Sequence, residues 1–207
     1  MTVSPRSETV SLKSTVHRDR LGGTEGNEIL TSAIALVLTG LLVAEGVTVI
    51  HMGGLIRAHM FIGMVLIPPA LLKLASTGYR FVRYYAGSQA YRTKGPPPLP
   101  LRLLAPVLVA TTLAVLTTGV LLLSAGHKSG ALLEIHKVSF IVWLAAFGIH
   151  LLAYLPRVVR SLRTDWSSAR RQAVPGAGLR AMMVTASLGG GVAVAVALVS
   201  SMESWRA

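Results

Sequence analysis

The sequence predicts an all-α integral membrane protein, a bundle of about five transmembrane helices with a four-helix core. Of its 207 residues, 52% are hydrophobic and only 14% are charged, which is too apolar for an ordinary soluble domain. Five apolar stretches each reach the roughly 20 residues that a helix needs to cross a bilayer. These stretches are residues 29–50, 56–78, 102–125, 131–155 and 179–201.

The basic residues predict the orientation of this bundle. The chain has 20 Lys+Arg against 8 Asp+Glu, an excess that would suggest nucleic-acid binding in a soluble protein. Here most basic residues precede the first stretch, follow the second or follow the fourth, and these three segments share one side of the membrane. The positive-inside rule makes that side cytoplasmic. We therefore expect a multi-pass protein of the plasma (inner) membrane with its N-terminus in the cytoplasm, its C-terminus outside and no nucleic-acid partner.

The apolar stretches also divide the chain into successive parts. The cysteine count is zero, which excludes disulfides, iron–sulfur clusters and thiol chemistry. The expected parts are a flexible cytoplasmic tail at 1–28, a four-helix core at 29–160, a basic cytoplasmic loop at 161–178, a fifth transmembrane helix at 179–201 and a short outer tail at 202–207.

Two local patterns concern helix shape and packing. Pro68 and Pro69 are expected to kink the second helix, because proline cannot donate a backbone hydrogen bond. Three consecutive glycines at 189–191 are expected to permit close contact with another helix or a local bend.

Histidines at matching depths in two helices form the candidate site. Counted from the outer side, His59 lies about four residues into the second helix and His136 about five residues into the fourth. Ionisable side chains are costly in a membrane, so their presence is a functional hypothesis by default. Two facing imidazoles in a helix bundle can supply both axial ligands of a haem iron. Gly63 is one turn deeper than His59 and lets the edge of a porphyrin approach the helix.

Charged residues lie beside the two proposed ligands. Arg57 and Lys137 are two and one positions away from them, where haem propionates need cationic partners. Glu45 lies at the same outer level in the first helix. It can accept an N–H from a ligand histidine, pair with Arg57 or handle a proton beside a quinone, and the sequence does not choose among these roles.

A second haem at the inner level lacks a complete ligand pair. His150 follows His136 by 14 residues, which places both rings on one helix face about 21 Å apart along the axis. The matching position of the second helix is Lys73, which most simply extends to the cytoplasmic interface. One haem is therefore expected, and His150 is a packed residue, a quinone-site residue or a weaker candidate for a second haem.

These histidines resemble those of the bacterial cytochrome b561-like family, which includes the cytochrome b subunits of nickel–iron hydrogenases and the gamma subunits of formate dehydrogenases. The segment from Arg57 to Tyr91, with R-x-H, I-P-P-A-L-L-K and G-Y-R-F-V-R-Y-Y, is also similar to bacterial membrane proteins with a cytochrome b/b6 domain. The resemblance implies that His59 and His136 hold haem b. In the family an inner haem pairs the counterpart of His150 with a histidine of the first helix, which this chain lacks.

The resemblance also implies a role in a respiratory chain. The chain would be the electron-transfer subunit of an oxidoreductase, with no substrate chemistry of its own. Electrons would pass between a partner oxidoreductase, of the molybdopterin type beside some similar proteins, and the quinone pool or another membrane carrier.

Two other classes of function stay open. One is a copper- or metal-handling membrane protein, since nitrogen and sulfur ligands together suit copper. Its candidate ligands on the outer side are His51, Met52, His59, Met60, Met64, His127 and His136. The other is a non-redox assembly subunit, which would leave the ionisable residues within the membrane without a purpose.

Overall fold

Five long apolar helices make up most of the structure, a computed structural model that describes residues 22–93, 95, 98–125, 130–164, 174–203 and 205 and, within 156–164, the backbone alone. The described residues contain no strand, and five of the helices are long and apolar enough to cross a membrane. This confirms the predicted all-helical membrane architecture. The five are α1 (Gly23–Ile50), α2 (Met52–Tyr85), α4 (Leu99–Ala125), α5 (Gly130–Thr164) and α7 (Ala177–Ala197).

Several helices differ in extent from the predicted spans. Helix α1 begins at Gly23, so the last part of the expected tail is helical, whereas residues 1–21 lie outside the described part. Two short helices were not expected: α3 (Gln89–Arg92) in the basic connection after α2, and α8 (Val199–Glu203) in the expected outer end. Hydropathy predicts only the extent of the continuous apolar stretch. A helix extends beyond this stretch as long as its backbone hydrogen bonds continue to form.

Apolar side chains face outwards along the helices. Ile50, Leu103 and Leu152 expose 77%, 66% and 69% of their surface, respectively. Such extended apolar exposure is unfavourable in water and is ordinary against lipid tails. The surface therefore agrees with a bilayer environment.

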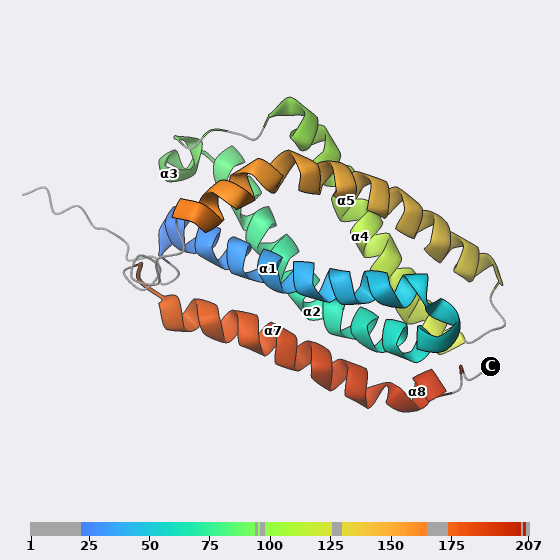
Figure 1. Cartoon of the computed structure of the whole chain (residues 1–207). Coiled ribbons are helices and arrows are strands. Elements are labelled where there is room, and N and C mark those ends of the chain that lie inside the picture. Colours follow the sequence, from blue (N-terminus) through green and yellow to red (C-terminus); the bar gives the residue numbers. More distant parts are fainter. Residues whose placement is uncertain are drawn as a thin grey trace, which may run out of the picture.

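Helix α2 is the centre of the packing. It packs closely against α1 on one side and α7 on another, while α4 and α5 form a second close pair that approaches α2 through α4 (Figure 1). Among the described helices, α2 and α5 are not a closely packed pair. We call the end of the bundle that holds the α1–α2 turn and α8 the outer end, after the orientation that the charges predict.

A polar cluster fastens α1 to α2 near the inner end. Asn27 and Ser76 are buried, and they exchange two hydrogen bonds: the Asn27 amide donates to the Ser76 carbonyl at 3.2 Å, and the Ser76 hydroxyl donates to Asn27 Oδ1 at 2.8 Å. Thr31 hydrogen-bonds the Ser76 hydroxyl, and Lys73 Nζ donates to the Thr31 carbonyl at 2.8 Å. Each polar group thus finds a protein partner, as an apolar surrounding requires.

Helix α7 crosses α2 at its prolines. Pro68 and Pro69 lie inside α2, and the residue of α2 with non-helical backbone angles is Leu55. Because Pro69 has no N–H, the carbonyl of Val65 lacks its usual helical donor. Gly191 of α7 packs against this carbonyl so closely that a Cβ on Gly191 would lie 2.5 Å from the Val65 oxygen. The expectation that the glycine run permits close helix contact is confirmed at Gly191.

We expect Ser76→Ala to lower the stability of the bundle by about 1 kcal/mol, because it leaves the Asn27 side chain short of a partner in an apolar surrounding. The measurement is the unfolding midpoint in a titration from mild detergent into SDS. Ser124→Ala is the matched control, since the Ser124 hydroxyl bonds only the Val120 carbonyl of its own helix. Equal midpoints for the two variants would contradict the role of the cluster.

Gly191→Ala should destabilise the docking of α7 by roughly 1–3 kcal/mol, the usual cost of overpacking, since the new methyl group meets backbone that cannot swing away. Gly190→Ala is its control, because nothing lies within 4 Å of a Cβ at that position. The same SDS titration, combined with limited proteolysis of the connection before α7, measures the effect. A Gly191→Ala protein as stable as the Gly190→Ala protein would show that the contact does not hold α7.

Candidate functional site

His59 lies in the outer part of α2 and is held by two residues of α1. Its Nδ1 is 3.0 Å from Glu45 Oε1 and 3.2 Å from the Thr48 hydroxyl. The Thr48 hydroxyl also donates to the Glu45 carbonyl at 2.6 Å and lies 3.2 Å from Glu45 Oε2. The side chains of His59 and Glu45 are only 20% and 14% exposed. The ring is therefore oriented through Nδ1 by a largely buried carboxylate and a hydroxyl.

His136 lies in α5 and is held in a similar way by α4. Its Nδ1 is 2.9 Å from the Thr118 hydroxyl. Gly119, the next residue of α4, is a close neighbour of the ring, because a Cβ there would be 3.4 Å from His136 Cε1. Thr118 is buried and also donates to the Ala114 carbonyl at 2.6 Å. A glycine at 119 thus allows α4 to support the imidazole at close range.

The two imidazoles face each other across the space between α2 and α5. Their ring centres are 6.4 Å apart, and their planes are inclined at 78°. A metal ion that bonds one nitrogen of each ring from opposite sides, at about 2 Å, separates the ring centres by about 6 Å. The separation of the ring centres therefore matches that expected for two imidazoles that bind one metal ion from opposite sides. A metal-ligating histidine usually has its second ring nitrogen hydrogen-bonded to a carboxylate, carbonyl or hydroxyl, and each Nδ1 here has such a contact.

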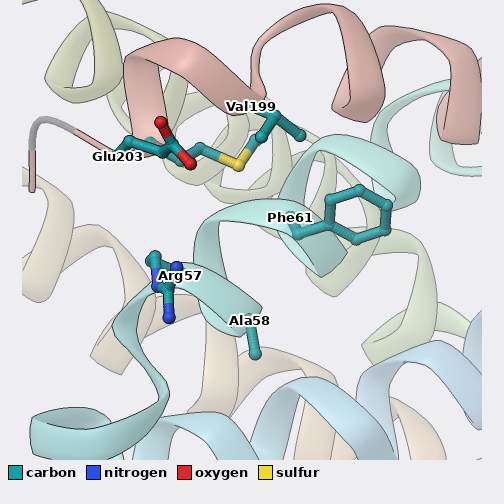
Figure 2. A pocket seen from close by; sticks show the side chains of 6 residues that line it. Arg57, Ala58, Phe61, Val199 and Glu203 are labelled. Atoms are coloured by element: carbon teal, nitrogen blue, oxygen red, sulfur yellow. The ribbon is translucent and has the colours of Figure 1, made fainter.

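The other residues proposed for this site have different neighbours. Gly63 borders Glu45, whose Oε1 would be 3.5 Å from a Cβ on the glycine. Lys137 extends along α5 to Glu134, 3.0 Å away, in an exposed pair. Arg57 faces a hollow between α2 and α8 (Figure 2); two residues before His59, it points about 200° around the helix from it. Gly63 thus lies beside Glu45, which contacts His59, whereas Arg57 points away from His59.

The inner level holds a different arrangement. His150 stacks at a tilt on Tyr154, with ring centres 4.7 Å apart. Lys73 does not extend freely towards the cytoplasm as expected, because its Nζ donates to the Thr31 carbonyl of α1. This carbonyl belongs to the stretch of α1 where the sequence lacks a histidine. At the inner level, the side chain of Lys73 therefore contacts α1 at a place where the family that the sequence resembles has a histidine.

Thr48 and Thr118 are the members of the site that sequence reasoning missed. Both also bond a carbonyl of their own helix, as Thr111 and Thr112 do in α4. A threonine in a membrane helix commonly satisfies its hydroxyl in this way. Only the position of the partner helix distinguishes a threonine that also contacts an imidazole, so no sequence signal marks these two.

Apart from the facing pair His59 and His136, the residues proposed as copper ligands lie in different surroundings. Met60 and Met64 pack in the apolar core with Val65 and Leu123. His51 forms the turn between α1 and α2, is exposed, and its Nδ1 lies 3.1 Å from the Val47 carbonyl. His127 is outside the described residues. Within the described part of the chain, no group of three or more His, Asp or Glu side chains is arranged to hold a metal ion.

Comparison with known proteins adds no relative to this description. No protein-family model, no curated protein and no solved structure matches the chain.

Proposed function

We propose that this protein is a membrane b-type cytochrome that passes electrons between a partner oxidoreductase and the quinone pool or another membrane carrier. One haem b, ligated by His59 and His136, would be its redox centre. The observation that supports this most directly is the pair of opposed imidazoles, 6.4 Å apart, each supported at Nδ1 by a neighbouring helix. Bound haem supplies reversible one-electron transfer at its iron.

The surrounding residues suit the task of holding such a group. Glu45 and Thr48 fix the ring of His59, and Thr118 fixes that of His136, so both rings are oriented before any ligand binds. Helices α2 and α5 are not packed closely together, which leaves the rings rather than the backbone to span the gap. A lipid surrounding offers little water to this site, which would limit the solvent rearrangement that accompanies a change in charge.

Two observations disfavour the alternatives. A copper site would use the thioethers of Met60 and Met64, and both side chains pack in the apolar core instead. A purely structural subunit would not need a carboxylate buried in the outer half of α1, and Glu45 contacts one of the two opposed imidazoles.

We expect His59→Ala and His136→Ala each to abolish the absorbance bands of low-spin bis-histidine haem, because each removes one axial ligand. His150→Ala should keep these bands and serves as the matched control. The measurement is the difference spectrum of oxidised and dithionite-reduced protein in detergent, with pyridine haemochrome and copper content determined on the same samples. About one haem per chain is expected, and intact bands in either of the first two variants would refute the ligand assignment.

A second prediction concerns Glu45. An ionised carboxylate at Nδ1 makes imidazole a stronger electron donor and so favours ferric iron. Glu45→Gln should shift the redox equilibrium towards the reduced state about tenfold, which corresponds to a rise of about 59 mV in midpoint potential for one electron.

The control for this experiment is Glu134→Gln. It makes the same chemical change at an exposed carboxylate of the outer end, one that pairs with Lys137 and is not in contact with either ring. Potentiometric titration of both variants measures the effect. An equal shift of the midpoint potential in the two variants would mean that the loss of a negative charge, and not the contact with His59 Nδ1, causes the effect. No shift in either variant would also contradict the proposed role of Glu45.

A further inference from the structure

A glycine turn ends α2 at the inner end of the bundle. Gly87 has a φ of 88°, in the left-handed region, and its N–H donates to the Tyr84 carbonyl at 3.3 Å. The N–H of Ser88 donates to the Arg83 carbonyl at 3.1 Å. These two bonds form a Schellman motif, a well-defined helix end that glycine favours. The chain passes from this turn directly into α3, which lies beside the end of α2 (Figure 1).

Two guanidinium groups lie beside this turn. Arg83 is in the last turn of α2, and its Nη2 donates to the Ser88 hydroxyl at 3.4 Å. Arg92 ends α3, and its Nε donates to the Tyr84 carbonyl at 3.5 Å. The Nη2 of Arg92 is 3.8 Å from the position of a Cβ on Gly87. Both arginines are exposed, so both cations face the surroundings of the protein.

No carboxylate of the described chain balances these two charges, because neither Arg83 nor Arg92 has an Asp or Glu oxygen at ion-pair distance. Arg80, about one turn earlier in α2, differs from them because it pairs with Glu28 of α1 at 3.6 Å. Two guanidinium groups on one turn repel each other, and an anion with several oxygens can accept hydrogen bonds from both. A phosphate group is such an anion.

Tyrosine side chains surround the turn, as at a membrane boundary. The guanidinium carbon of Arg83 is 6.0 Å from the ring centres of Tyr79 and Tyr91. Arg102 of α4 donates to the Tyr85 hydroxyl at 2.9 Å. Tyrosine favours the level of the lipid headgroups, because it has an apolar body and a polar tip. A phosphate bound by Arg83 would therefore lie at headgroup level.

An exposed stripe of α2 leads from the middle of the helix to this turn. Its members recur at intervals of three or four residues and therefore share one helix face. They are Leu71, Ala75, Gly78 and Val82, and all four are exposed. Leu71 and Val82 expose 49% and 60% of their surface, and nothing lies within 4 Å of a Cβ at Gly78. An acyl chain can therefore lie along about 16 Å of the helix, up to the residue before Arg83.

We propose that the inner end of α2 binds an anionic phospholipid, such as phosphatidylglycerol. Arg83 and Arg92 bind its phosphate, and an acyl chain lies along the stripe from Leu71 to Val82. An acidic segment of a soluble protein would match the two charges but would leave the apolar stripe uncovered. This site lies at the opposite end of α2 from the two facing imidazoles and does not depend on the presence of haem.

The net charge of the headgroup determines the selectivity of this site. Phosphatidylcholine carries a quaternary ammonium close to its phosphate, and the two guanidinium groups repel that cation. Phosphatidylglycerol has no such cation. Near a membrane surface, each basic residue strengthens the binding of an anionic lipid about fivefold. The two arginines should therefore favour phosphatidylglycerol over phosphatidylcholine about tenfold or more.

The test uses the full chain purified in detergent and titrated with phosphatidylglycerol or phosphatidylcholine of identical acyl chains. Native mass spectrometry counts the bound lipid, and thermal unfolding gives an independent measure of binding. We expect about tenfold tighter binding of phosphatidylglycerol. Equal binding of the two lipids by the unmodified protein would overturn the proposal without the use of any variant.

Three variants assign the selectivity to the turn. Arg83→Gln and Arg92→Gln should each weaken the binding of phosphatidylglycerol about fivefold and leave that of phosphatidylcholine unchanged. Arg80→Gln is the matched control, because it removes the same charge from the same end of α2 but from an arginine that Glu28 already balances. An equal loss in all three variants would mean that the overall charge of the inner end attracts the lipid. That result, or unchanged binding in both Arg83→Gln and Arg92→Gln, would overturn the proposed site.

A final comparison separates a membrane lipid from other anions. Glycerophosphoglycerol has the same phosphate without acyl chains, and a hexaglutamate peptide represents an acidic protein segment. We expect both to compete at least about tenfold more weakly than the lipid, because neither covers the apolar stripe. Competition as strong as that of the lipid, by either compound, would contradict the role assigned to the stripe from Leu71 to Val82.

Discussion

The arrangement of the bundle depends on the need of polar groups in a bilayer for partners within the protein. Helix α2 provides partners of this kind at both of its ends. Near the inner end of α2, Ser76 and Lys73 hydrogen-bond groups of α1. Near the outer end of α2, His59 contacts Glu45 and Thr48, which also belong to α1. Apolar contact alone would let α1 slide or rotate against α2, since lipid tails are as apolar as leucine. Polar contacts at both ends fix the rotation, and that rotation directs His59 towards α5.

The prolines of α2 have a related consequence on its other side. A carbonyl without its helical donor is exposed to a surrounding that offers no water, and the close approach of a glycine backbone is one way to cover it. Val65 and Gly191 meet in this manner, which ties the position of α7 to a local defect in α2. The hollow between α2 and α8 follows from the same docking, because α8 continues directly from α7.

Much of the fold was predictable from the sequence, whereas less of the site was. The five spans follow from hydropathy, and their ends were less accurate because residues such as Thr24 or Tyr85 extend a helix without being part of an apolar run. The pairing of His59 with His136 followed from depth alone, since two straight helices that cross the same bilayer place equal depths at equal heights. The sequence position of Arg57 did not predict the direction of its side chain, because two residues that are close in sequence can lie on different faces of a helix. The role of Thr118 required knowledge of which helices are neighbours.

The tight turn at His51 has a consequence for how the two halves of the histidine site assemble. It joins α1 to α2 through a single residue, so Glu45 and His59, 14 positions apart in the chain, meet within one helical hairpin. Thr118 and His136, separated by 18 positions, likewise meet within the hairpin of α4 and α5. Each imidazole is therefore oriented by contacts within its own hairpin, between residues that are close in sequence. Bringing His59 and His136 together then requires a further, long-range step, the approach of two hairpins in which each ring already has its supporting contacts.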